Sequence, residues 1–175
     1  MGDSLSAAFG IERTQGWVNL LQDHLNSKGK NYKVINASVS GETTRGGLTR
    51  LPRSLKRHQP TIVIIALGGN DGLRGLPLKE FRKNLEAMVT LAKSSKAKVV
   101  LCGVRIPPNL GLTYVSEFIY VYTETAQKHN IPLVQYLLKN VSSKTNLMQN
   151  DGIHPTAEAQ PIILKNVLSG LNNLI

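Results

Sequence analysis

The sequence lacks several features that mark special protein classes. It has a single cysteine, Cys102, among 175 residues, so a disulfide within the chain is impossible and a metal cluster held by several thiolates is excluded. Its longest near-continuous apolar run, Ile62 to Leu67, is far too short to span a membrane. No repeat, low-complexity tract or linker is visible. These absences indicate a globular protein of ordinary composition.

The composition agrees with that conclusion. Apolar residues make up 41% of the chain and charged residues 18%, which excludes wholesale disorder. A chain of 175 residues matches one domain, and we expect it to extend over residues 1–175. Such a domain can bury about 70% of the surface that its unfolded chain exposes, enough for a hydrophobic core.

Acidic residues are scarce relative to basic ones. The 11 Asp and Glu residues face 21 Lys and Arg residues, which gives a net charge of +10. This balance favours an anionic partner, such as nucleic acid, anionic lipid or a phosphate-bearing substrate. The densest basic stretch, Arg45 to Arg57, has the spacing of a solvated helix face or of a binding stripe, so charge alone does not select a function.

Apolar residues at helical spacing alternate with short β-branched runs. The pattern predicts helices over residues 15–27, 44–58, 78–94, 113–129 and 156–174, and strands over residues 33–37, 61–67, 98–103 and 132–135. This alternation predicts an α/β fold with a parallel sheet. Ligands of such folds bind outside the carboxyl ends of the strands, which directs attention to the loops there.

Three of these loops, and a turn at the N-terminus, carry residues suited to hydrolytic chemistry. Asp151 and His154, three residues apart, can bring a carboxylate to an imidazole, and Pro155 restricts the backbone of His154. Asn70 follows the strongest predicted strand, and Gly41 follows the strand predicted before it. At the N-terminus, Ser4 stands on a turn leading toward a helix. Taken singly, each motif also fits a plain turn or helix cap.

Together and in this order, the motifs are far more specific. The motifs form the blocks Gly2–Ser6, Asn36–Thr43, Gln59–Pro60, Leu67–Gly75 and Asp151–Pro155 followed by Ala159–Pro161, which are spread over essentially the whole chain. They resemble the SGNH (GDSL) hydrolase superfamily, and most closely its bacterial subfamily of acyl-CoA thioesterases, lysophospholipases and arylesterases. The resemblance implies a three-layer α/β/α, flavodoxin-like fold. Because Ser6 stands where a glycine would complete Gly-x-Ser-x-Gly, an α/β-hydrolase elbow is not expected.

The resemblance also implies a role for each site residue. Ser4 would be the nucleophile, His154 the general base and then acid, and Asp151 the group that orients the imidazole. The backbone N–H groups of Ser4 and Gly41 and the side-chain amide of Asn70 would form the oxyanion hole. The implied substrate-binding residues are Asp71, Gly72, Leu73, Ile106, Pro107, Pro108 and Leu110.

The implied reaction is cleavage of esters and thioesters through an acyl-serine. The resemblance implies no metal and no cofactor, a small acyl ester, acyl-CoA or lysophospholipid as substrate, no nucleic acid partner, and a monomer. Two alternatives stay open: a carbohydrate O-acetylesterase on the same fold, and a non-catalytic module that binds anionic ligands.

One departure from the family concerns the N-terminus. The family has a β-strand immediately before its Gly-Asp-Ser block, whereas only Met1 precedes Gly2 here. Either this strand lies upstream of Met1, or the chain is short and we expect poor stability and little activity. The resemblance implies a periplasmic enzyme, although the given sequence contains no signal peptide; a cytoplasmic location is the alternative.

Overall fold

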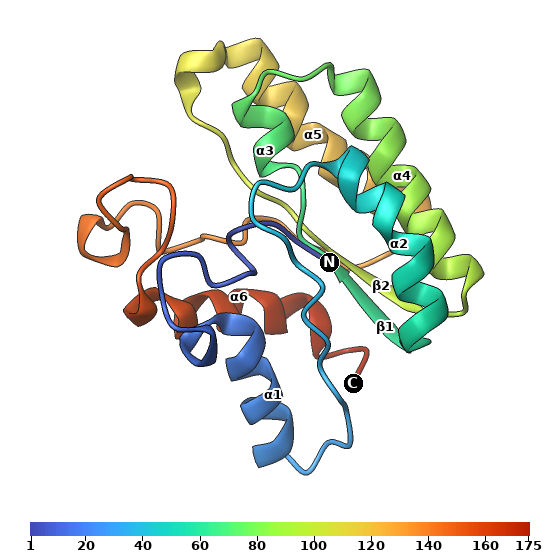
Figure 1. The fold of residues 1–175 in the computed structure, drawn as a ribbon. Helices are drawn as coiled ribbons and strands as arrows, with labels where there is room; N and C mark the ends of the chain where they lie inside the picture. Colours follow the sequence, from blue (N-terminus) through green and yellow to red (C-terminus); the bar gives the residue numbers. More distant parts are fainter.

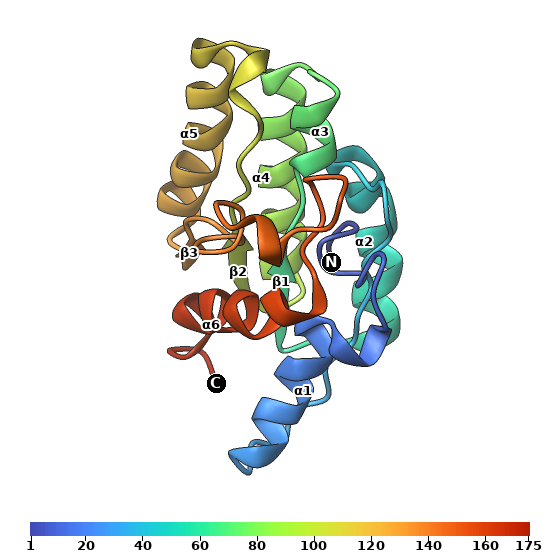
Figure 2. The same ribbon diagram turned by 90° about the vertical axis from the view of Figure 1, so that its left-hand side faces the viewer.

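A computed structural model describes all residues from 1 to 175. Its sheet has three parallel strands in the order β1 (Ile62–Ile65), β2 (Lys98–Cys102) and β3 (Leu133–Val134). One face of the sheet is covered by α1 (Trp17–Ser27) and α6 (Gln160–Leu171) (Figure 1). The other face is covered by α2 (Thr44–His58), α4 (Leu78–Ser94) and α5 (Leu112–His129) (Figure 2). The predicted three-layer α/β fold with a parallel sheet is therefore confirmed.

Shorter elements complete the chain. A single turn of helix, α3 (Gly69–Leu73), follows β1. Four 3₁₀ turns lie at Arg13–Gln15, Pro108–Leu110, Thr145–Leu147 and Ala157–Ala159. None of the helices is both long enough and apolar enough to cross a membrane.

The core lies between the sheet and the helices because each helix has an apolar stripe. On α4 the residues Phe81, Leu85, Met88 and Ala92 recur at helical spacing and are all buried. In β2 the residues after Lys98 are buried on both faces of the sheet, as expected of a strand covered on both sides.

The strand predicted over residues 33–37 is not formed. This stretch is irregular, because a strand needs neighbours that complete its hydrogen-bond ladder. On one side the N–H of Val34 donates to the side chain of Gln22, at 2.7 Å. On the side that faces the sheet, the first backbone hydrogen bond comes only after this stretch, where the N–H of Val39 donates to the oxygen of Gly2 at 3.0 Å. Gly2 in turn forms an isolated parallel bridge with Ala66, next to β1.

An apolar groove of about 190 Å³ therefore lies between β1 and residues 32–38, and 17 of its 25 lining residues are hydrophobic. The oxygen of Thr61 accepts from Lys98 on the β2 side, so alternate residues Ile62 and Ile64 direct their peptide groups into the groove. The nitrogen of Met1 donates to the oxygen of Ile64 at 3.0 Å. This edge of β1 is thus paired only where Met1 and Gly2 lie beside it.

Candidate active site

A cleft of about 570 Å³ lies at the carboxyl edge of the sheet. It is lined by residues from six segments of the chain: the turn after Gly2, the loop before α2, α3, the loop after β2, the segment after β3, and the C-terminal loop that contains His154. Because parallel strands end at the same edge, their following loops meet there. The volume is in the range of pockets that bind small ligands.

Two side chains of this cleft, Ser4 and His154, form a continuous hydrogen-bonded series with the adjacent Asp151. The Nε2 atom of His154 lies 2.9 Å from Oγ of Ser4. The Nδ1 atom of the same ring lies 2.6 Å from Oδ2 of Asp151. With Asp151 ionised, Nδ1 carries the ring proton of a neutral imidazole, and Nε2 is left to accept from the Ser4 hydroxyl. The structure therefore joins the three predicted residues in the order that general-base activation of a serine requires.

Asp151 and His154 owe their mutual position to a small loop. The residues at its base, Met148 and Pro155, form an antiparallel bridge, and Gly152 allows the tight turn with a φ of +67°. Oδ1 of Asp151 accepts from the N–H groups of His154 and Ile153, at 3.0 and 2.9 Å. These hydrogen bonds, with the one to the His154 ring, lower the pKa of Asp151 to about 2. The carboxylate is therefore charged at neutral pH.

Ser4 is placed by a turn built around Asp3. The oxygen of Asp3 accepts from the N–H groups of Ser6 and Ala7, and its Oδ1 accepts from Leu5 at 3.0 Å. The N–H of Ser4 makes no hydrogen bond within the protein, so it remains available to a ligand. Asp3 itself is buried, and this burial raises its pKa to about 6.

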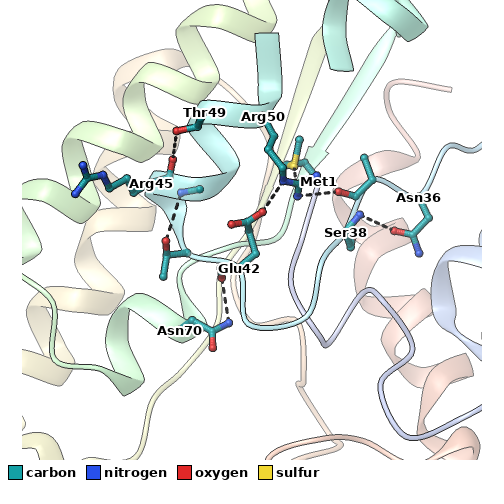
Figure 3. Close-up of polar contacts among 11 residues, drawn as sticks. Met1, Asn36, Ser38, Glu42, Arg45, Thr49, Arg50 and Asn70 are labelled. Atoms are coloured by element: carbon teal, nitrogen blue, oxygen red, sulfur yellow. Dashed lines mark hydrogen bonds and ion pairs between the residues drawn. The ribbon is translucent and has the colours of Figure 1, made fainter. Parts of the chain in front are cut away.

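The other two predicted oxyanion donors also line the cleft. Gly41 has a φ of +78°, a conformation that favours glycine, and its N–H is unpaired. The side-chain nitrogen of Asn70 donates one hydrogen to the main-chain oxygen of Glu42, at 3.0 Å (Figure 3). Its second amide hydrogen has no partner in the protein. The N–H of Ser4, the N–H of Gly41 and one amide hydrogen of Asn70 are thus three donors in this cleft that have no protein partner. Such donors can form an oxyanion hole.

The predicted substrate-binding residues divide into two groups. Leu73, Ile106, Pro107 and Pro108 line the cleft. Three other residues predicted to bind substrate, Asp71, Gly72 and Leu110, do not line it. Asp71 is buried and accepts from the N–H and hydroxyl of Thr44. Gly72 is covered by Ile106 and Phe118, and Leu110 packs against the core.

Sequence reasoning missed several wall residues. Phe9 lies with its ring centroid 4.3 Å from that of His154, at a tilt of 36°, although 48% of it is exposed. Gln149 donates to the oxygens of both Phe9 and Pro155, which ties the N-terminal turn to the His154 loop. Met148 and Ile153 also line the cleft. Phe9 and Ile153 are exposed apolar side chains near the motifs, but exposure is not visible in a sequence.

Residues 1–161 match the model of the GDSL-like Lipase/Acylhydrolase family. The chain belongs to this family. It is therefore an ester hydrolase.

Individual relatives resemble the chain along its whole length. It is 46% identical to the esterase TesA of Pseudomonas aeruginosa over 175 residues, which are 100% of this chain and 87% of the relative. It is 39% identical to an Escherichia coli protein named thioesterase 1/protease 1/lysophospholipase L1, over 100% of this chain and 83% of the relative.

Solved structures agree with this. A crystal structure of TesA superposes with a TM-score of 0.97 at 46% identity, covering 99% of this chain and 97% of the other. The psychrotrophic esterase EstA from Pseudoalteromonas, in a structure inhibited by monoethylphosphonate, gives a TM-score of 0.94 at 40% identity, covering 99% of this chain and 94% of the other.

Proposed function

We propose that the chain hydrolyses carboxylic esters and thioesters through an acyl intermediate on Ser4. The observation that carries this proposal is the hydrogen-bonded series from Asp151 through His154 to Ser4, next to unpaired N–H donors. A module that only binds a ligand has no need of a serine hydrogen-bonded to an oriented imidazole.

The geometry supports a two-step reaction. Oγ of Ser4 attacks the carbonyl carbon while its proton passes to Nε2 of His154. The carbonyl oxygen gains negative charge and accepts from the N–H groups of Ser4, Gly41 and Asn70. His154 then gives the proton to the departing alkoxide or thiolate. A water molecule, activated by His154, adds to the acyl-serine and releases the acid.

The cleft walls suit acyl substrates that carry a polar or phosphorylated leaving group. Leu73, Ile106 and Pro107 supply an apolar wall for an acyl chain. Arg105 is exposed in the cleft, and its guanidinium lies 4.8 Å from the centre of the Tyr136 ring, so a cation is held in the cleft. These features support acyl-CoA, lysophospholipid and aryl esters as substrates. Action as a monomer and a periplasmic location stay predictions.

The test is covalent labelling with an activated fluorophosphonate, followed by intact mass and peptide mapping. We expect one adduct per chain, on Ser4, and none on the Ser4→Ala variant. Labelling of another serine, or none at all, would contradict the role of Ser4. Hydrolysis rates on acyl-CoA, lysophospholipid and acetylated sugar then rank the substrates, and a strong preference for the sugar would favour an O-acetylesterase.

A further inference from the structure

The loop from Ala37 to Glu42 connects all three donors of the oxyanion hole. Gly41 belongs to the loop. The N–H of Val39 donates to the oxygen of Gly2, two residues before Ser4. The oxygen of Glu42 accepts from the side chain of Asn70. The position of this loop therefore determines where the donors stand relative to one another.

The loop itself has little packing to hold it. Val39, Ser40 and Gly41 are all exposed, and the one backbone hydrogen bond inside the loop runs from Glu42 to Val39, at 3.2 Å. In the middle of the loop, the oxygen of Gly41 accepts from Nη2 of Arg74 at 3.1 Å. An exposed loop with so few contacts depends on such polar contacts, including those at its ends, to hold its position.

Arg50 on α2 provides such a restraint at both ends of the loop. Its Nε donates to Oε2 of Glu42 at 2.6 Å, and its Nη2 donates to the oxygen of Ala37 at 3.1 Å (Figure 3). The same Nη2 lies 3.5 Å from Sδ of Met1. The Glu42 side chain is only 12% exposed and that of Arg50 35%. The planar guanidinium can hold two acceptors in a fixed geometry, which an ammonium cannot.

We propose that Arg50 is a positioning residue for the oxyanion hole, which it stabilises by joining Ala37 to Glu42 across the loop that carries Gly41. This inference rests on the proposed function. Arg50 is not among the residues that line the cleft, so it acts through the loop and through the Glu42 oxygen that holds Asn70. Because oxyanion stabilisation appears only in the transition state, loss of Arg50 lowers kcat more than it changes KM.

The test compares Arg50→Met with Arg53→Met, which removes the same charge from an exposed position of the same helix. We expect Arg50→Met to lower kcat by about 10- to 100-fold with KM changed less than about 3-fold. Arg50→Lys should restore little of the lost kcat, since one ammonium cannot hold both acceptors. Glu42→Gln keeps an acceptor for Arg50 but removes the charge, and it should lower kcat by about 3- to 10-fold. It replaces Arg50→Met as the test if that variant does not fold. Arg53→Met should leave kcat unchanged.

A double variant separates positioning from general damage. If Arg50 acts through the oxyanion hole, Arg50→Met costs much less in the Asn70→Ala background than alone. Fluorophosphonate labelling of Ser4 should also slow by a factor similar to the loss in kcat. Unchanged kcat in Arg50→Met, a loss confined to KM, or strictly additive losses with Asn70→Ala would each overturn the proposal. Turnover that survives Ser4→Ala would instead overturn the proposed function.

Discussion

The two halves of the active site are built in different ways. The proton-transfer half, Asp151 and His154, comes from one small loop whose hydrogen bonds join residues two or three apart. The oxyanion half joins three segments, and its supporting contacts run between residues as far apart as Glu42 and Asn70, 28 positions away in the chain. Ser4 alone takes part in both halves.

This difference teaches which substitutions should have separable effects. A change in the local loop removes one function and leaves the donors in place. A change in the oxyanion half can disturb several donors together, because one loop connects them. The substitutions below test this contrast, from the largest expected effect to the smallest.

Ser4→Ala removes the group shared by both halves. We expect turnover to be abolished to within the detection limit, because the covalent step loses its nucleophile. The melting temperature should change little, since the Ser4 hydroxyl contacts only His154. The measurement is kcat/KM on an acyl-CoA and a phenyl ester, with thermal unfolding in parallel. Substantial residual turnover would show that another group attacks the substrate.

Asp151→Asn tests the local half. The asparagine amide carries no negative charge to hold the Nδ1 proton and to stabilise the imidazolium. We expect kcat to fall by about 10³- to 10⁴-fold. Asp23→Asn, a substitution of an exposed aspartate on α1, is the matched control and should leave kcat unchanged. Fluorophosphonate labelling of Ser4 measures the same loss. A fall of less than about tenfold would mean that His154 is oriented without Asp151.

Asn70→Ala tests the assembled half. Loss of one donor should lower kcat by about 10²- to 10³-fold with a small change in KM. The variant also releases the oxygen of Glu42, so the loss should be coupled to Arg50, unlike that of Asp151→Asn. Asn19→Ala, at an exposed position of α1, is the control. If the losses in kcat from Asn70→Ala and from every other substitution simply multiplied in the double variants, the two halves of the site would not differ in how their residues are coupled.

Two carboxyl groups near Ser4 should give opposite pH dependences of stability. In the folded protein the pKa of Asp151 is lowered to about 2. Its contribution to the stability of the fold is therefore present at pH values above the ordinary pKa of 3.8 and is lost as the pH falls toward 2. In the folded protein the pKa of Asp3 is raised to about 6. Its contribution to the stability of the fold is therefore present below pH 3.8 and is lost as the pH rises through 6.

Asp3→Asn tests the second of these. It keeps an acceptor for Leu5 without the charge, and it should gain stability relative to the wild type by on the order of 3 kcal/mol between pH about 4 and pH about 7.5. Urea unfolding of both proteins at the two pH values measures this difference. Parallel curves would mean that Asp3 does not titrate in this range.

Much of the fold could be predicted because its signals are local. The helices over residues 44–58 and 78–94 have the predicted limits, since apolar residues at a period near 3.6 specify a helix with one buried face. The strands at 62–65 and 98–102 lie inside the predicted runs. The residues of the hydrogen-bonded series were also predicted, because the motifs taken together and in order resemble those of a known family; taken singly, each also fits a plain turn.

The errors concern features that depend on neighbours. Residues 33–37 have the composition of a strand but lack ladder partners, so they stay irregular. Asp71 follows Asn70 directly, yet it points into the interior toward Thr44 while Asn70 lines the cleft. The contact between the rings of Phe9 and His154 joins positions at opposite ends of the chain.

The sequence by itself determined the element types, the α/β class and the identity of the reactive side chains, because these follow from periodicity and from short motifs. Only the tertiary structure decided which motif residues face the cleft, which loop holds the oxyanion donors, and that Arg50 restrains this loop. The physical reason is that hydrogen bonds and burial act between groups that meet in space, and the pairs that meet here are mostly distant in the chain.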